Sequence, residues 1–171
     1  MPTDQPVIRR ADPTESDRVA EVMWRVREQS ATIGAIPPSV HPLEDMKTWM
    51  SRMVFTRHEV WVGVDGETFV AVLVLGRPDW LEHLYIDNSH TGQGLGSRLV
   101  DLAKQELGGR VQLWTFQSNH GARRFYERHG FVAVETTDGD NEEGQPDVRY
   151  VFTPDTPETV GGLHEDGPQT G

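Results

Sequence analysis

Two short segments of the chain hold residue types that could do chemistry. The first, residues 87–100, reads DNSHTGQGLGSRLV and places glycines at positions 92, 94 and 96, between a strand-like and a helix-like apolar run. A loop of this kind exposes main-chain N–H groups at the positive end of a helix, where phosphate or pyrophosphate binds. The same glycines could instead serve a turn that needs positive φ. The motif alone does not choose between these two interpretations.

Two common phosphate-binding motifs fit this loop poorly. In the dinucleotide pattern G-x-G-x-x-G, an acidic residue follows about 20 residues on. Here the third glycine comes one residue early, and position 112 is glutamine. The P-loop requires a lysine after its last glycine, and this chain has none there.

The second segment, residues 119–131, reads NHGARRFYERHGF. Ala122, Phe125, Tyr126 and His129 recur at helical spacing and therefore share one helix face. Asn119 precedes this helix and can cap it. Phe125 has the type and spacing of a core residue. Tyr126 carries a hydroxyl group that needs a partner when buried, and without further context it is interpreted as a core tyrosine whose hydroxyl is satisfied.

Hydrophobic periodicity predicts the elements that position these segments. Strands are expected near residues 7–11, 60–64, 68–75, 80–86, 111–116, 131–134 and 148–152. Helices are expected over about 12–30, 43–54, 94–107 and 119–130. Because strands alternate with both helices and hairpins, the sheet is predicted to be mixed.

The two segments and this order of elements resemble the motifs and the element order of the GNAT superfamily of acyl-CoA-dependent N-acetyltransferases. The resemblance rests on Gln93-Gly94-Leu95-Gly96 after a strand and, about 25 residues later, on Asn119-x-x-Ala122-x-x-Phe125-Tyr126-x-x-x-Gly130-Phe131. It implies an α/β fold (α+β in some schemes): a mixed, mostly antiparallel sheet of six to seven strands, about four flanking helices, and a splay between strands 4 and 5. It covers residues 6–153, and residues 154–171 are expected to form a disordered acidic tail.

The resemblance implies direct transfer of an acetyl group from acetyl-CoA, the co-substrate, to a primary amine of a small molecule or protein. It implies that Tyr126 protonates the departing CoA thiolate. The residues that it places at the CoA are Leu84, Tyr85 and Ile86 on the strand, Thr91, Gly92, Gln93, Gly94, Leu95, Gly96 and Ser97 in the loop, and Asn119, Ala122 and Tyr126. Thr91 stands where the family usually has glutamine or arginine.

An alkylammonium has a pKa of about 10.4, so the acceptor must lose a proton before it attacks, and a general base would help. Glu82 is the first candidate, because strict alternation places it with Leu84 and Ile86 toward the cleft and directs His83 and Tyr85 away. His120 is a second candidate. The acceptor site is expected to come from the first two helices, the loop between them and the acidic loop at 136–147. Location alone also suggests residues for this site, which are Trp24, Arg27, Ile33, Ile36, His41 and Trp49.

Composition limits the remaining possibilities. The 171 residues carry a formal net charge of −11, which disfavours nucleic acid as a partner. The chain has no cysteine, and its seven histidines lack metal-ligand spacing, so no metal is expected. No apolar run is long enough for a membrane span, and a cytoplasmic location is expected. A homodimer is a possible state.

Two functions other than catalysis by a GNAT enzyme remain open from the sequence. One is a non-catalytic sensor of acyl-CoA with the same fold, and the other is a nucleotide-binding enzyme of another class. Asn119 and Tyr126 together favour the enzyme, because a sensor does not need an acid.

Overall fold

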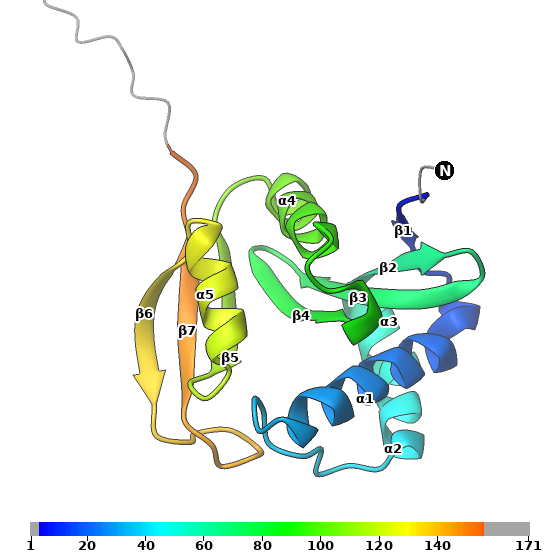
Figure 1. Cartoon of the computed structure of the whole chain (residues 1–171), viewed down its shortest axis with the longest axis horizontal. Helices are drawn as coiled ribbons and strands as arrows, with labels where there is room; N and C mark the ends of the chain where they lie inside the picture. Colours follow the sequence, from blue (N-terminus) through cyan, green and yellow to red (C-terminus); the bar gives the residue numbers. More distant parts are fainter. Residues whose placement is uncertain (1–3, 156–171) are drawn as a thin grey trace, which may run out of the picture.

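A seven-stranded mixed sheet organises the computed structural model, which describes residues 4–155 (Figure 1). Its spatial order is β1-β2-β3-β4-β5-β7-β6. The strands are β1 (Val7–Arg10), β2 (Glu59–Asp65), β3 (Thr68–Gly76), β4 (Trp80–Ile86), β5 (Val111–Phe116), β6 (Val132–Thr137) and β7 (Asp147–Phe152). All neighbouring strands are antiparallel except β4 and β5, which are parallel.

The helices are α1 (Ser16–Thr32), α2 (Leu43–Trp49), α3 (Phe55–Arg57), α4 (Leu95–Leu107) and α5 (His120–Arg128). The helix predicted over residues 43–54 is divided, because a π-helical turn (Met50–Val54) joins α2 to α3. The fold class predicted from the sequence is confirmed. Most of the predicted tail, from residue 156 on, lies outside the described residues.

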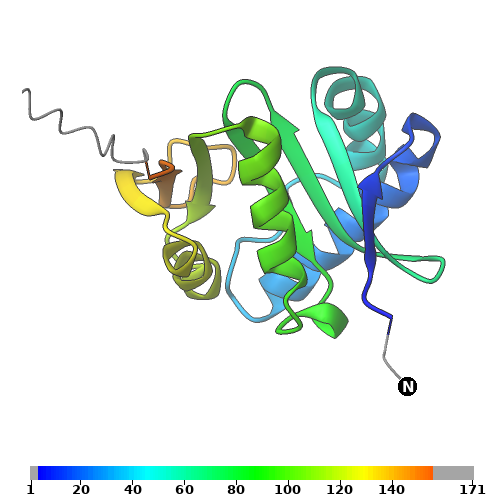
Figure 2. The ribbon, with the colours of Figure 1, turned by 90° about the horizontal axis from the view of Figure 1, so that it is seen from above.

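Helices cover both faces of the sheet, and each face has its own apolar core (Figures 1 and 2). On one face, α1 and α2 pack on Val60, Val62, Val72 and Val74. On the other, α4 and α5 pack on Leu73, Leu75, Leu81 and Leu113. The run FVAVLVL in β3 is buried throughout, as expected for a strand covered on both faces.

The sheet opens between β4 and β5. Their pairing is confined to Trp80 opposite Gln112, next to a hydrogen bond from the Gln112 amide to the Asp79 carbonyl (2.8 Å). Beyond this point the two strands diverge (Figure 1). The edge of β4 that faces β5 is therefore left without a strand partner toward Ile86, and the predicted splay is confirmed.

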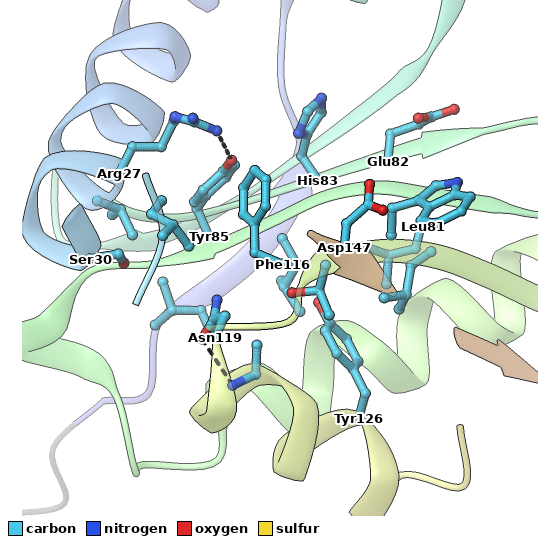
Figure 3. Close-up of a pocket in the computed structure, with 18 of the residues that line it drawn as sticks. Arg27, Ser30, Leu81, Glu82, His83, Tyr85, Phe116, Asn119, Tyr126 and Asp147 are labelled. Carbon is cyan, nitrogen blue, oxygen red and sulfur yellow. Dashed lines mark hydrogen bonds between the residues drawn. The ribbon is translucent and has the colours of Figure 1, made fainter. Parts of the chain in front are cut away.

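A β-bulge in β4 corrects the predicted orientation of Glu82. His83 pairs with Val74 and Leu81 with Leu75, so Glu82 is the extra residue. A bulge breaks strict alternation: Leu81 joins Leu84 and Ile86 on the α4 side, whereas Glu82 projects with His83 toward the other face (Figure 3). The prediction that Glu82 shares a face with Leu84 and Ile86 is therefore wrong.

Candidate active site

A cavity of about 430 Å³ lies where β4 and β5 diverge, and we call it the splay cavity. It is lined by residues of β4, β5, α1, α5 and the β6–β7 loop (Figure 3). The lining includes seven of the residues predicted to contact CoA, which are Leu84, Tyr85, Ile86, Thr91, Asn119, Ala122 and Tyr126. Glu82 also lines it.

The glycine loop joins β4 to α4, and its three glycines serve two different purposes. Gly92 and Gly94 have φ of 72° and 84°, which L-residues rarely adopt, and a Cβ on either would meet open space. Gly96 is needed for packing instead, because a Cβ there would lie 3.0 Å from Ile86 Cδ1 and 3.1 Å from Phe125 Cζ. No side chain caps α4, so its first N–H groups remain available to an anion.

Asp87 fixes the start of this loop. Its carboxylate accepts hydrogen bonds from the Ser89 amide (3.0 Å), the Ser89 hydroxyl (2.7 Å) and Arg25 Nε of α1 (2.8 Å). Burial alone would raise the pKa of Asp87, but these donors outweigh it and hold the pKa well below its ordinary value. Thr91 donates its hydroxyl to the Asn88 carbonyl (3.1 Å). Its side chain therefore stabilises the loop itself.

Tyr126 is the main candidate acid. It lies on α5 with only 7% of its surface exposed, packed against Phe125 and Phe131, and it lines the splay cavity (Figure 3). Burial raises the pKa of its phenol well above the ordinary value. The hydroxyl has no hydrogen-bond partner within residues 4–155. A protonated phenol with no protein partner is suited to donating to a ligand.

Asn119 stands at the start of α5, about two turns before this tyrosine. Its Oδ1 accepts the amide hydrogen of Ala122 (3.2 Å), which confirms the predicted helix cap. Ser97, in the first turn of α4, bonds to His129 Nε2 (3.0 Å). His129 Nδ1 donates to the Phe125 carbonyl, which can only accept, and Nε2 of the same ring engages the Ser97 side chain. Only the main chain of Ser97 is left to contact a phosphate.

Two titratable side chains lie at the bulge of β4. Glu82 approaches His58 Nε2 at 3.8 Å, and Gly76 makes this possible, since a Cβ there would lie 2.7 Å from Glu82 Oε1. His83 stacks on Tyr85 with ring centroids 6.0 Å apart. Burial, Arg27 and His58 lower the pKa of His83 to about 4, so its ring is neutral at pH 7.

A second cavity, of about 520 Å³, adjoins the first. We call it the helix-side cavity, because α1, α2, the loop between them and the β6–β7 loop surround it. Its lining residues are Met23, Arg27, Ser39, Val40, His41, Asp45, Met46, Trp49, His83, Tyr85, Glu142 and Glu143. Arg27, His83, Tyr85 and Glu143 line both cavities, so the two spaces meet there.

Arg27 occupies this junction. It donates to the Tyr85 hydroxyl (3.2 Å) and to Glu143 (3.3 Å), and only 13% of its side chain and 16% of that of Glu143 are exposed. Figure 3 shows the bond between Arg27 and Tyr85. This contact ties α1 to β4 and to the β6–β7 loop, which lie far apart in the sequence.

The structure divides the residues predicted by location for the acceptor site. Arg27, Ile36, His41 and Trp49 line a cavity. Trp24 of α1 is half-buried against the core, and Ile33 is exposed outside both cavities. His120 is exposed on α5 and lines neither cavity. Sequence reasoning missed His83, because alternation correctly turned it away from Leu84 and Ile86 but could not show that this other face of β4 also lines the cavities.

The described part of the chain holds neither a cluster of metal-ligating side chains nor a membrane-spanning helix. Within residues 4–155, no three histidine, aspartate or glutamate side chains come together as metal ligands would. No helix in this part of the chain combines the length and apolar character needed to cross a membrane.

Comparison with known proteins identifies the class. The sequence profile of the Acetyltransferase (GNAT) family matches residues 22–131. The match covers more than half of the chain, and the sheet has the predicted splay, so the chain belongs to the GNAT acetyltransferase family. Membership of this family supports a function as an acyltransferase. No curated protein matches the chain significantly.

Solved structures share the fold at low identity. A GCN5-related N-acetyltransferase from Rhodopseudomonas palustris has a TM-score of 0.72 at 16% identity, over 90% of this chain and 98% of that one. An acetyltransferase from Thermus thermophilus has a TM-score of 0.70 at 20% identity, over 90% and 99%. A ribosomal-protein-alanine N-acetyltransferase from Brucella melitensis has a TM-score of 0.63 at 15% identity, over 86% and 99%.

Proposed function

We propose that this protein is an N-acetyltransferase that moves an acetyl group from acetyl-CoA directly to a primary amine. The observation that carries the proposal is the position of Tyr126. Its phenol is buried and protonated, lacks a partner among residues 4–155, and lines the cavity beside the unpaired edge of β4. An acid is useful there only if a leaving group needs a proton.

The chain offers acetyl-CoA a fitting site. The open space at Gly92 and Gly94 and the uncapped N–H groups of Leu95, Gly96 and Ser97 suit a pyrophosphate. The unpaired edge of β4 suits the amide groups of the pantetheine arm, which can bind as an added strand. When bound, acetyl-CoA supplies a thioester, whose C–S bond breaks as the amine forms the new C–N bond.

Two side chains of this protein then transfer the protons of the reaction. Tyr126 gives its proton to the departing sulfur. Glu82, which lines the splay cavity beside His58, takes a proton from the amine through water. Main-chain N–H groups at the bulge of β4 would stabilise the negative charge that develops on the carbonyl oxygen.

The helix-side cavity is the place for the amine. It meets the splay cavity at Arg27, His83 and Tyr85, so a nucleophile held in one space can reach an acyl group held in the other. This juxtaposition supplies the proximity that acyl transfer requires.

A thiol-release assay tests the proposal. Purified protein is mixed with acetyl-CoA and a panel of primary amines, and the acetamide is detected by mass spectrometry. The protein contributes no background, because it has no cysteine. We expect amine-dependent release of one CoA for each acetamide. Calorimetric binding of acetyl-CoA without acetylation of any amine would contradict the enzyme and favour the non-catalytic sensor.

A further inference from the structure

The helix-side cavity has a predominantly apolar wall. Met23, Val40 and Met46 contribute aliphatic and thioether surface, and Trp49 lies edge-on to His83 with ring centroids 5.5 Å apart. His83 in turn stacks on Tyr85. The wall therefore combines a row of three rings with methionine and valine side chains, which favours an apolar and preferably flat ligand body.

Most polar side chains around this cavity already have partners within the protein. Arg27 donates to Tyr85 and Glu143, His41 contacts Glu142, and the Ser39 hydroxyl donates to the His41 carbonyl (2.9 Å). A ligand rich in hydroxyl or amide groups would find few partners here and would lose its hydration. Amino sugars and extended peptides are disfavoured for this reason.

The charges at this cavity favour a cation and oppose a carboxylate. Asp45, Glu142 and Glu143 are three acids at its lining, and Asp45 makes no ion pair within residues 4–155. Arg27 is positive, but it already donates a hydrogen bond to Glu143. Its one nitrogen without a hydrogen-bond partner, Nε, is fully buried, so a ligand cannot reach it. An ammonium group is attracted, whereas a ligand carboxylate is repelled.

The junction with the splay cavity has the opposite character. Burial and the positive charge of Arg27, with a further contribution from the neighbouring His58, lower the pKa of His83 to about 4. The same surroundings disfavour an alkylammonium beside His83 and favour the free amine. A cation drawn to the acids would thus lose its proton where a nucleophile is needed.

We infer that the acceptor of this enzyme is a primary amine with an apolar, preferably aromatic, body and no carboxylate. The inference rests on the proposed function, since it names the substrate class of that same site. The volume of about 520 Å³ suits a molecule of small-ligand size.

A competition among four amines tests this inference. Thiol release from acetyl-CoA is measured with phenethylamine, phenylalanine, glucosamine and spermidine. We expect kcat/KM for phenethylamine to exceed that for phenylalanine by about 100-fold or more, the cost of an uncompensated carboxylate near apolar surface. A preference for any of the other three amines would overturn the inference while leaving the proposed function standing.

Two matched variants locate the site. Trp49 and Met53 lie one turn apart on adjoining helical segments and are equally exposed, at 38% and 39%, but only Trp49 lines the cavity. Trp49→Ala should raise KM for phenethylamine about tenfold or more without changing KM for acetyl-CoA. Met53→Ala should leave both unchanged. Equal effects of the two variants would overturn the inference.

A binding measurement separates failure of the inference from failure of the proposed function. Phenethylammonium is observed by ligand-detected NMR with the CoA-saturated protein. Binding that Trp49→Ala abolishes would uphold the ligand class even if no amine were acetylated, an outcome that contradicts the enzyme alone. Absence of binding together with acetylation of another amine would reject the ligand class alone.

Discussion

Tyr126 and Tyr150 are two buried tyrosines whose ring centroids lie 6.4 Å apart, yet their hydroxyl groups have different surroundings. The Tyr150 hydroxyl donates to Glu127 (2.8 Å) and accepts from Arg123 Nε (3.1 Å), so both of its capacities are used within the protein. The Tyr126 hydroxyl opens into the splay cavity. The two residues therefore form a natural pair for separating a catalytic hydroxyl group from a structural one.

The first prediction concerns this pair. Tyr126→Phe removes the proton for the leaving sulfur and should lower kcat about 100-fold with little change in KM for acetyl-CoA. Tyr150→Phe should keep kcat and lower the free energy of unfolding by about 1 kcal/mol. Thiol-release kinetics and urea unfolding measure the two effects. An unchanged kcat in Tyr126→Phe would remove this residue from the mechanism.

The second prediction concerns His83 and its neighbour Arg27. NMR titration of the imidazole should give a pKa of about 4 in the native protein. Arg27→Met removes a positive charge that opposes the imidazolium, so the pKa of His83 should rise. It should stay below the ordinary value, because burial is the larger cause and remains. A pKa that is unchanged or lower in the variant would show that Arg27 does not act on this ring.

At the scale of elements, the sequence predicted what is periodic and missed what is irregular. The alternating and helical patterns located the strands and the helices around both motifs. The orientation of Glu82 was predicted wrongly, because one extra residue in β4 reverses the alternation and has no local signature. His83 was missed for a different reason: alternation correctly placed it opposite Leu84 and Ile86, but the face that it shares with Tyr85 also lines both cavities.

The third prediction tests the packing role of Gly96 in the glycine motif. Gly96→Ala forces α4 away from Ile86 and Phe125, so it should lower the free energy of unfolding by about 1–3 kcal/mol. Gly121→Ala is the matched control, because it also lies in the first turns of a helix and a Cβ there meets nothing within 4 Å. It should raise stability by about 0.5–1 kcal/mol. Urea unfolding measures both, and equal effects would refute the packing argument.

At the scale of the whole molecule, the site exists because distant loops meet across the sheet. His41 and Glu142 contact each other although they are 101 residues apart, and the Ser118 hydroxyl donates to the Ala35 carbonyl (2.9 Å). The sequence suggested that the α1–α2 and β6–β7 loops form the acceptor site. It could not indicate which of their side chains pair, since such pairs depend on the final fold of both loops.

Besides the contact of Arg27 with Glu143, two further carboxylates attach helix α1 to the rest of the molecule. Near its start, Glu15 accepts two hydrogen bonds from Arg9 of β1, both of 2.8 Å, and one from the Asp12 amide (2.8 Å). Further along, Arg25 of α1 binds Asp87 at the start of the glycine loop. Because α1 also lines both cavities through Arg27, its attachment affects the stability of the fold and the shape of the site.

The fourth prediction follows from the first of these attachments. Hydrogen bonds from Arg9 and Asp12 lower the pKa of Glu15 to about 2, below its unfolded value near 4.3. The resulting stabilisation is present above the unfolded value and is lost as pH falls through the folded one. Glu15→Gln should therefore lower the free energy of unfolding by about 1–2 kcal/mol at pH 7. This difference from the native protein should shrink below pH 4 and vanish near pH 2.

Urea unfolding across this pH range measures the difference. Glu67→Gln is the control, since the Glu67 side chain makes no ion pair within residues 4–155. A cost that is independent of pH would show that the Glu15 charge does not anchor α1.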